Sequence, residues 1–151
     1  MIKKERSMKS NHLLMQVIVL VALVATLGSL YFSEIRAYAP CEMCWYQRII
    51  MYPMALMSLI SVIRKEMNIA YYLLVFSSIG IVAAIYHYAL QKLSVFSDLN
   101  MCTGVSCTVQ YINWFGFITI PFLALIANII IFVCSIIIIK NLKKGRITNG
   151  K

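Results

Sequence analysis

The chain has 151 residues, of which 62% are hydrophobic and only 13% are charged, and its formal net charge is +9. A soluble domain of this size could not bury so much apolar surface, and a disordered chain would be poor in hydrophobic residues. The composition therefore excludes both classes and indicates a small integral membrane protein, with residues 1–151 forming a single membrane domain.

Four segments are apolar enough to cross a bilayer as helices, which takes about 20 residues each. We expect these helices at about residues 13–33, 45–63, 67–91 and 117–139. Three of the segments carry no formal charge, whereas the second includes Arg48 near its beginning. The sequence therefore predicts an all-α, polytopic four-helix bundle, with outer loops at residues 34–44 and 92–116.

Basic residues are distributed unevenly between the two sides of this bundle. Most of the 14 Lys and Arg residues lie in the two tails and in the turn between the second and third helices. These segments share one side, and cytoplasmic segments are enriched in Lys and Arg. We therefore predict that both termini are cytoplasmic and that the two outer loops are extracytoplasmic. Because topology accounts for the net charge, we expect no nucleic-acid partner.

A few small and polar residues inside the spans predict how the helices pack. Ala25 and Ser29 lie four residues apart, as do Gly80 and Ala84, and this spacing allows a neighbouring helix to approach closely. We expect Asn128, in the fourth span, to form a hydrogen bond with another helix.

Four of the five cysteines fall in the outer loops, as two close pairs. Cys41 and Cys44 lie where the first outer loop enters the second helix, and Cys102 and Cys107 lie in the second outer loop. Disulfides form and persist on the oxidising side of a membrane. Four cysteines allow three pairings, of which neighbour pairing is the simplest. Cys134, inside the fourth span, is expected to behave as a small hydrophobic residue.

The Cys41-x-x-Cys44 pair is the stronger candidate for redox chemistry. So short a ring restricts the unfolded chain little, whereas this spacing at a helix start suits reversible oxidation. The helix dipole favours a thiolate at Cys44, and Arg48 lies one turn further along. An arginine at membrane depth indicates function, although an interfacial anchor reaching to the headgroups is the alternative.

A thiolate beside a fixed positive charge at the membrane boundary can pass two electrons to a lipid-soluble acceptor. Arg48 would stabilise the negative charge that develops on a reduced quinone. The sequence contains no flavin, haem or nicotinamide motif. We therefore expect the acceptor to arrive from the membrane or to dock from outside.

Residues 41–48, with the sequence CEMCWYQR, are followed by Tyr86-His87-Tyr88 and a later outer cysteine pair. This pattern resembles the DsbB family, and within it the short BdbB/BdbC-type thiol–disulfide oxidoreductases of Gram-positive bacteria. The resemblance covers about residues 10–140. It implies an enzyme of the bacterial plasma membrane that reoxidises an extracytoplasmic thioredoxin-like thiol oxidase (DsbA/BdbD-like). The electrons would pass to a membrane quinone, for which we expect a menaquinone, with ubiquinone as the alternative.

The resemblance also implies redox-active disulfides Cys41–Cys44 and Cys102–Cys107. Cys102 is similar to the cysteine that forms a mixed disulfide with the partner protein, and Cys107 would pass the electrons to Cys41. In this chain only residues 103–106 separate the second pair, whereas Gram-negative members have a much longer segment. The separate roles of these two cysteines therefore stay open.

On the membrane side, the resemblance implies that Cys44 contacts the quinone and that Arg48 holds its ring oxygen. His87 matches a family histidine near the quinone. Its alternative role is that of an interfacial histidine in an aromatic belt with Tyr86 and Tyr88. We expect no metal site.

Three other functions are compatible with parts of the pattern. A quinone reductase of the vitamin K epoxide reductase type also uses a C-x-x-C pair, but in its last helix. A Cu(I)-binding or copper-transport protein could use Met51, Met54 and Met57, although this spacing is also typical of a packing face. A purely structural membrane partner would leave the two outer cysteine pairs and Arg48 unexplained.

Overall fold

The computed structural model describes residues 2–93, 111–113, 115 and 117–149. Within these residues the chain forms four long helices: α1 (Ile2–Leu30), α2 (Glu42–Arg64), α3 (Ala70–Lys92) and α4 (Ile120–Asn149). A π-helical turn, η1 (Tyr31–Ile35), extends α1, and a 3-10 turn, η2 (Met67–Ile69), leads into α3. Each long helix includes a segment long and apolar enough to span a membrane. The prediction of an all-α, polytopic four-helix bundle is confirmed.

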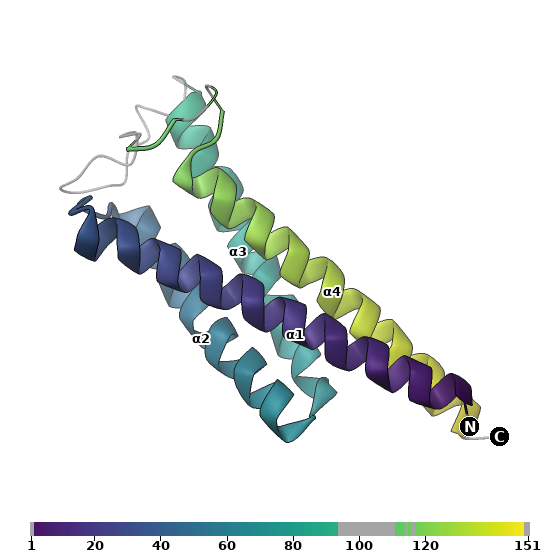
Figure 1. Ribbon diagram of the computed structural model, residues 1–151. Helices are drawn as coiled ribbons and strands as arrows, with labels where there is room; N and C mark the ends of the chain where they lie inside the picture. The colour runs from purple at the N-terminus through teal and green to yellow at the C-terminus, as the bar shows by residue number, and fades with distance from the viewer. Residues whose placement is uncertain (1, 94–110, 114, 116, 150–151) are drawn as a thin grey trace.

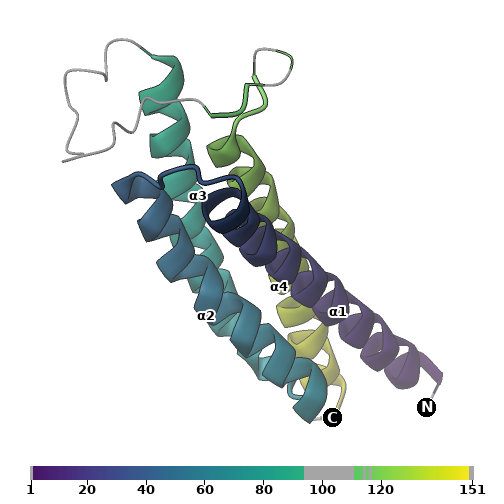
Figure 2. The ribbon, with the colours of Figure 1, turned by 60° about the vertical axis from the view of Figure 1, so that its left-hand side comes forward.

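The four helices pack around a closed ring. Helix α1 contacts α2 and α4, and α3 contacts the same two neighbours from the opposite side. The start of α1 and the end of α4 lie at one end of the bundle, and the α1–α2 connection lies at the other (Figures 1 and 2). The predicted cytoplasmic position of the terminal end stays a prediction.

Several helix ends differ from the segments predicted from hydropathy, and α3 and α4 each begin three residues later than predicted. Helix α1 begins at Ile2 and α4 continues to Asn149, because Lys, Glu and Arg residues in the tails are good helix formers outside a bilayer. Helix α2 begins at Glu42, three residues earlier than predicted. Cys44 therefore lies in the first turn of a helix and not in the loop expected at residues 34–44.

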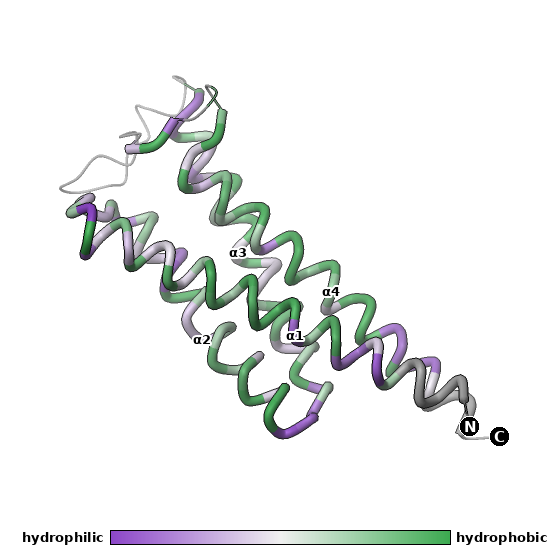
Figure 3. Tube along the Cα trace, in the orientation of Figure 1, coloured by the Kyte–Doolittle hydropathy of each residue, from purple (hydrophilic) through white to green (hydrophobic). Residues whose placement is uncertain are grey.

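The surface and the interior have the polarity expected of a protein solvated by lipid. Large apolar side chains such as Leu20, Leu56 and Val82 point outward with more than 60% of their surface exposed. Figure 3 shows hydrophobic residues along the middle of the helices and hydrophilic ones near their ends. Several polar side chains lie inside instead: Asn11, Arg48, Ser58, Ser61, Ser77, His87, Thr119, Asn128 and Ser135. Such an exposed apolar surface needs lipid around it.

A glycine allows α3 and α4 to approach each other closely. A Cβ atom at Gly80 would lie 2.7 Å from Cγ of Asn128 on α4, so a larger residue would force the Asn128 side chain to shift. This confirms the predicted small-residue packing. The predicted interhelical hydrogen bond of Asn128 is wrong, because its Nδ2 donates to the Ala124 carbonyl one turn earlier in α4 (2.8 Å). Its Oδ1 has no hydrogen-bond partner.

Candidate active site

The Cys41–Cys44 pair lies at the N-terminus of α2. Cys41 is the N-cap residue, with extended backbone angles, and its carbonyl accepts the N–H of Trp45 (3.2 Å). The two Sγ atoms are 3.0 Å apart, and both cysteines are free thiols. A disulfide has an S–S length of about 2.05 Å, so the structure describes the reduced pair in position to close.

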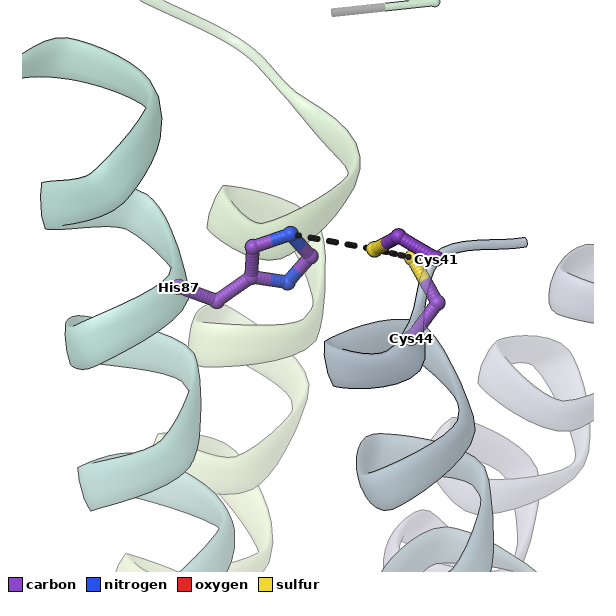
Figure 4. Close-up of side chains that lie close together, drawn as sticks. All are labelled: Cys41, Cys44 and His87. Carbon is purple, nitrogen blue, oxygen red and sulfur yellow. Dashed lines mark hydrogen bonds between the residues drawn. The ribbon is translucent and has the colours of Figure 1, made fainter. Parts of the chain in front are cut away.

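His87, from the C-terminal part of α3, lies beside this pair (Figure 4). Its Nε2 is 3.6 Å from Cys41 Sγ, and the side chain is fully buried. Its Nδ1 has no hydrogen-bond partner. Cys41 is only 7% exposed and packs against Leu90 of α3, the helix that carries His87. His87 follows Cys41 by 46 residues in the sequence. The C-x-x-C pair and the histidine therefore come together in one buried cluster only through the packing of α2 and α3.

These contacts favour a negative charge on one sulfur of the pair. The hydrogen bond with Cys44 lowers the pKa of Cys41 to about 4, and hydrogen bonding and charge from His87 act in the same direction, while burial opposes them. A thiolate is also the reactive form of cysteine. The helix dipole and Arg48 favour a thiolate at Cys44 on sequence grounds, whereas the side-chain contacts favour it at Cys41.

Arg48 is enclosed within the bundle and has only 7% of its surface exposed. Its Nε donates to the Ser29 hydroxyl on α1 (2.7 Å), and its Nη2 donates to the Ser29 carbonyl (2.9 Å). Its guanidinium carbon lies 5.2 Å from the centre of the Trp45 ring. An interfacial anchor would extend toward the headgroups, so this geometry favours the functional interpretation of Arg48.

A cavity of about 540 Å³ lies between α1, α2 and α4. Cys44, Gln47 and Arg48 contribute from α2, and Ser29 contributes from α1. Most of the remaining wall is apolar and comes from α1 and α4, including Leu20, Val24, Leu123, Ala127 and Ile130. Small-molecule sites have volumes of about 300–1,000 Å³, with mostly apolar walls and a few polar groups.

The structure brings together some of the residues predicted from sequence and separates others. Cys44 and Arg48 share the cavity, whereas His87 contacts Cys41 and is not part of the cavity lining. Cys102 and Cys107 lie outside the described residues. The sequence indicated Ser29 only as a small packing residue, and neither Ser29 nor Gln47 was expected at the site.

Gln47 provides a further polar group in the cavity wall. Its buried Nε2 has no hydrogen-bond partner. The only sequence signal for it was its place next to Arg48 in the cysteine motif. Buried polar groups rarely lack a partner, so a donor left free in a cavity wall is available to a ligand.

A model of the family "Disulfide bond formation protein DsbB" matches residues 11–138, most of the chain. The chain belongs to the DsbB family. DsbB-family membership supports thiol–disulfide oxidoreductase activity in disulfide bond formation, in a multi-pass membrane protein.

Relatives within the DsbB family match most of the chain. "Disulfide bond formation protein C" of Bacillus subtilis (strain 168) is 56% identical over 117 residues, which cover 76% of this chain and 85% of the relative. "Probable disulfide formation protein C" of Halalkalibacterium halodurans is 57% identical over 122 residues, covering 80% and 89%. "Probable disulfide formation protein" of Oceanobacillus iheyensis is 43% identical over 145 residues, covering 95% and 98%. No solved structure matches the chain significantly.

Proposed function

We propose that this protein oxidises an extracytoplasmic thioredoxin-like dithiol protein (DsbA/BdbD-like) and passes the electrons to a membrane quinone. The observation that carries the proposal is that Cys44 and Arg48 line one apolar cavity between helices that span the membrane. Such a cavity suits a flat, lipid-soluble ring, and a menaquinone is the expected occupant. The two cysteine pairs would face the outside of the bacterial plasma membrane.

The reduced pair supplies the electrons. As the Cys41–Cys44 disulfide forms, the two sulfurs give up two electrons and their remaining protons. A quinone bound in the cavity accepts two electrons and takes up two protons in total. Of the two cysteines, only Cys44 lines the cavity, while Cys41 packs against α3. The electrons therefore leave the pair on the Cys44 side.

Arg48 and Gln47 would orient the acceptor and stabilise its reduced form. Arg48 is held by Ser29 at the cavity wall, so its positive charge is already in place before negative charge develops on a ring oxygen. Fixed charges in a site from which water is excluded stabilise a developing anion more than they would in water. The free amide of Gln47 offers a second donor.

The second pair would connect this site with the partner protein. We propose that a partner thiolate attacks Cys102 of the Cys102–Cys107 disulfide, which forms the mixed disulfide and releases Cys107. Cys107 then attacks Cys41 of the Cys41–Cys44 disulfide and releases Cys44 as a thiolate, while the partner's second thiol resolves the mixed disulfide. Thiol–disulfide exchange needs direct contact between sulfurs, and Cys41 lies at the N-cap of α2, at the end of the bundle where α3 ends at Lys92. The resulting order is partner dithiol, second pair, Cys41–Cys44 and quinone.

The copper alternative gains nothing from the methionines. Met51 and Met54 are buried in the core formed with α1 and α4, with 6% and 0% of their surface exposed. They pack against neighbouring helices, as their spacing on one helix face predicts. A quinone reductase of the vitamin K epoxide reductase type is disfavoured by the family match over residues 11–138.

The proposal is tested by following quinone absorbance with the purified protein in lipid nanodiscs, supplied with a reduced thioredoxin-like dithiol protein. Turnover is expected from the parent and from Cys134→Ala, and should disappear in Cys41→Ser and in Cys44→Ser. A folded parent that reduces neither menaquinone nor ubiquinone would contradict the proposal. Turnover that survives Cys44→Ser would contradict the assigned role of the pair.

A further inference from the structure

Cys41, Cys44 and His87 form a cluster of three metal-ligand side chains. Their ligand atoms all lie within 4.8 Å of one another, and Cys41 and His87 are buried. The proposed electron transfer uses the two sulfurs but gives no role to the imidazole, which lies outside the cavity lining. The cluster is also the only such group among the described residues.

We propose that the reduced protein binds one Zn²⁺ through Cys41 Sγ, Cys44 Sγ and His87 Nε2, and that the bound metal holds the pair in its dithiol state. The metal replaces the thiol protons, so no oxidant or reductant takes part in binding. Three protein ligands leave one tetrahedral position for water or another small ligand.

The distances fit a zinc site after a small movement. Zn–S and Zn–N bonds of about 2.3 and 2.0 Å at tetrahedral angles place S and N about 3.5 Å apart and the two sulfurs about 3.8 Å apart. Cys41 Sγ and His87 Nε2 are already 3.6 Å apart. The sulfurs, at 3.0 Å, must separate by about an ångström, which a rotation of the Cys44 side chain can supply.

Charge balance favours Zn²⁺ in this place over a monovalent soft ion. Two thiolates and one neutral imidazole around Zn²⁺ give a complex with no net charge, and a buried site penalises uncompensated charge strongly. Nε2 of His87, which contacts Cys41 Sγ (3.6 Å), is directed at Cys41 in Figure 4, on the side where the sulfurs lie. Oxidation would abolish the site, because a disulfide offers no thiolate ligands.

The test uses a background in which Cys41 and Cys44 are the only cysteines, made by Cys102→Ser, Cys107→Ser and Cys134→Ala. The reduced protein is freed of reductant without oxygen and titrated with Zn²⁺ against a chromophoric chelator. One Zn²⁺ per chain is expected, and none for the same protein after oxidation of the pair. Co²⁺ in place of Zn²⁺ should give thiolate-to-metal absorption and the visible bands of tetrahedral coordination.

Histidine variants separate this site from simple dithiol binding. His87→Gln should lower Zn²⁺ affinity by at least about tenfold. Loss of a residue that only hydrogen-bonds a metal ligand already lowers affinity about 10- to 100-fold, and loss of a ligand should cost no less. His12→Gln, at the chain's other histidine, is the matched control and should leave the affinity unchanged.

Three results would each overturn the proposal: a helical His87→Gln protein that binds as tightly as the parent, equal binding by the oxidised protein, or octahedral Co²⁺ bands. Because neither quinone nor the partner protein is present, these results are independent of the proposed electron transfer.

Discussion

Removing the Ser29 hydroxyl should weaken quinone binding through Arg48. Ser29→Ala deletes the acceptor of Arg48 Nε (2.7 Å) and leaves the main-chain acceptor of Nη2 (2.9 Å) in place. Hydrogen bonds to charged groups contribute about 1.5–3 kcal/mol, which corresponds to roughly 10- to 150-fold in binding. Because one of the two contacts remains, we expect the low end, about a tenfold rise in the quinone KM.

The measurement is quinone reduction at varied quinone concentration with the dithiol partner saturating. The kcat should change little, since the cysteines are untouched, and Ser29→Thr should restore the KM because it keeps the hydroxyl. Ser33→Ala is the matched control: its hydroxyl donates to the Leu30 carbonyl (3.2 Å) and does not contact Arg48. An unchanged KM in a folded Ser29→Ala protein, or a failure of Ser29→Thr to restore it, would refute this account of Arg48.

Three further predictions concern the cysteine pair and the helix packing. Cys44→Ser should abolish quinone reduction while a reduced partner protein still reduces the second cysteine pair, as measured by thiol labelling; full quinone turnover would contradict it. In the reduced protein the lowered pKa of Cys41 keeps its sulfur a thiolate down to about pH 4, whereas an ordinary thiol is protonated below about pH 8.5. Thiolate ultraviolet absorbance that is lost between pH 8 and 6 would count against the hydrogen bonds described. Gly80→Ala should lower thermal stability in detergent, since the new Cβ meets Asn128 and overpacking costs about 1–3 kcal/mol. The control Gly28→Ala, where the new Cβ has no atom within 4 Å, should not lower it. Equal melting temperatures of the two variants would argue against the close approach of α3 and α4.

The fold and half of the site could be predicted from sequence because their signals are local. Apolar runs identified the four spans, since a bilayer demands them. Cys44 and Arg48 were placed together because four residues make about one helical turn, and they line the same cavity. Helix ends were missed because tail residues such as Lys3 continue a helix without adding to its hydrophobicity.

The rest of the site depends on how helices rotate and pack, which a single sequence does not encode locally. Ser29 is one of several small or hydroxyl-bearing residues near the end of α1, and only the packing of α1 on α2 makes it the partner of Arg48. His87 contacts Cys41 because of the register between α2 and α3. The Asn128 side chain donates its hydrogen bond within its own helix because the carbonyl four residues earlier is in reach, so its amide nitrogen needs no acceptor on a neighbouring helix.

The hydrogen bonds between Arg48 and Ser29 also bear on how the chain enters the bilayer. Helix α2 is the least apolar of the four spans. An arginine at the centre of a lone inserted helix costs about 2.5–3.5 kcal/mol, and Arg48, near the beginning of α2, carries a smaller cost of the same kind. Ser29 of α1 supplies two acceptors that meet part of this cost. Insertion of α1 and α2 as a hairpin is therefore favoured over insertion one helix at a time. A chain that fails to pair them presents an unsatisfied guanidinium to lipid.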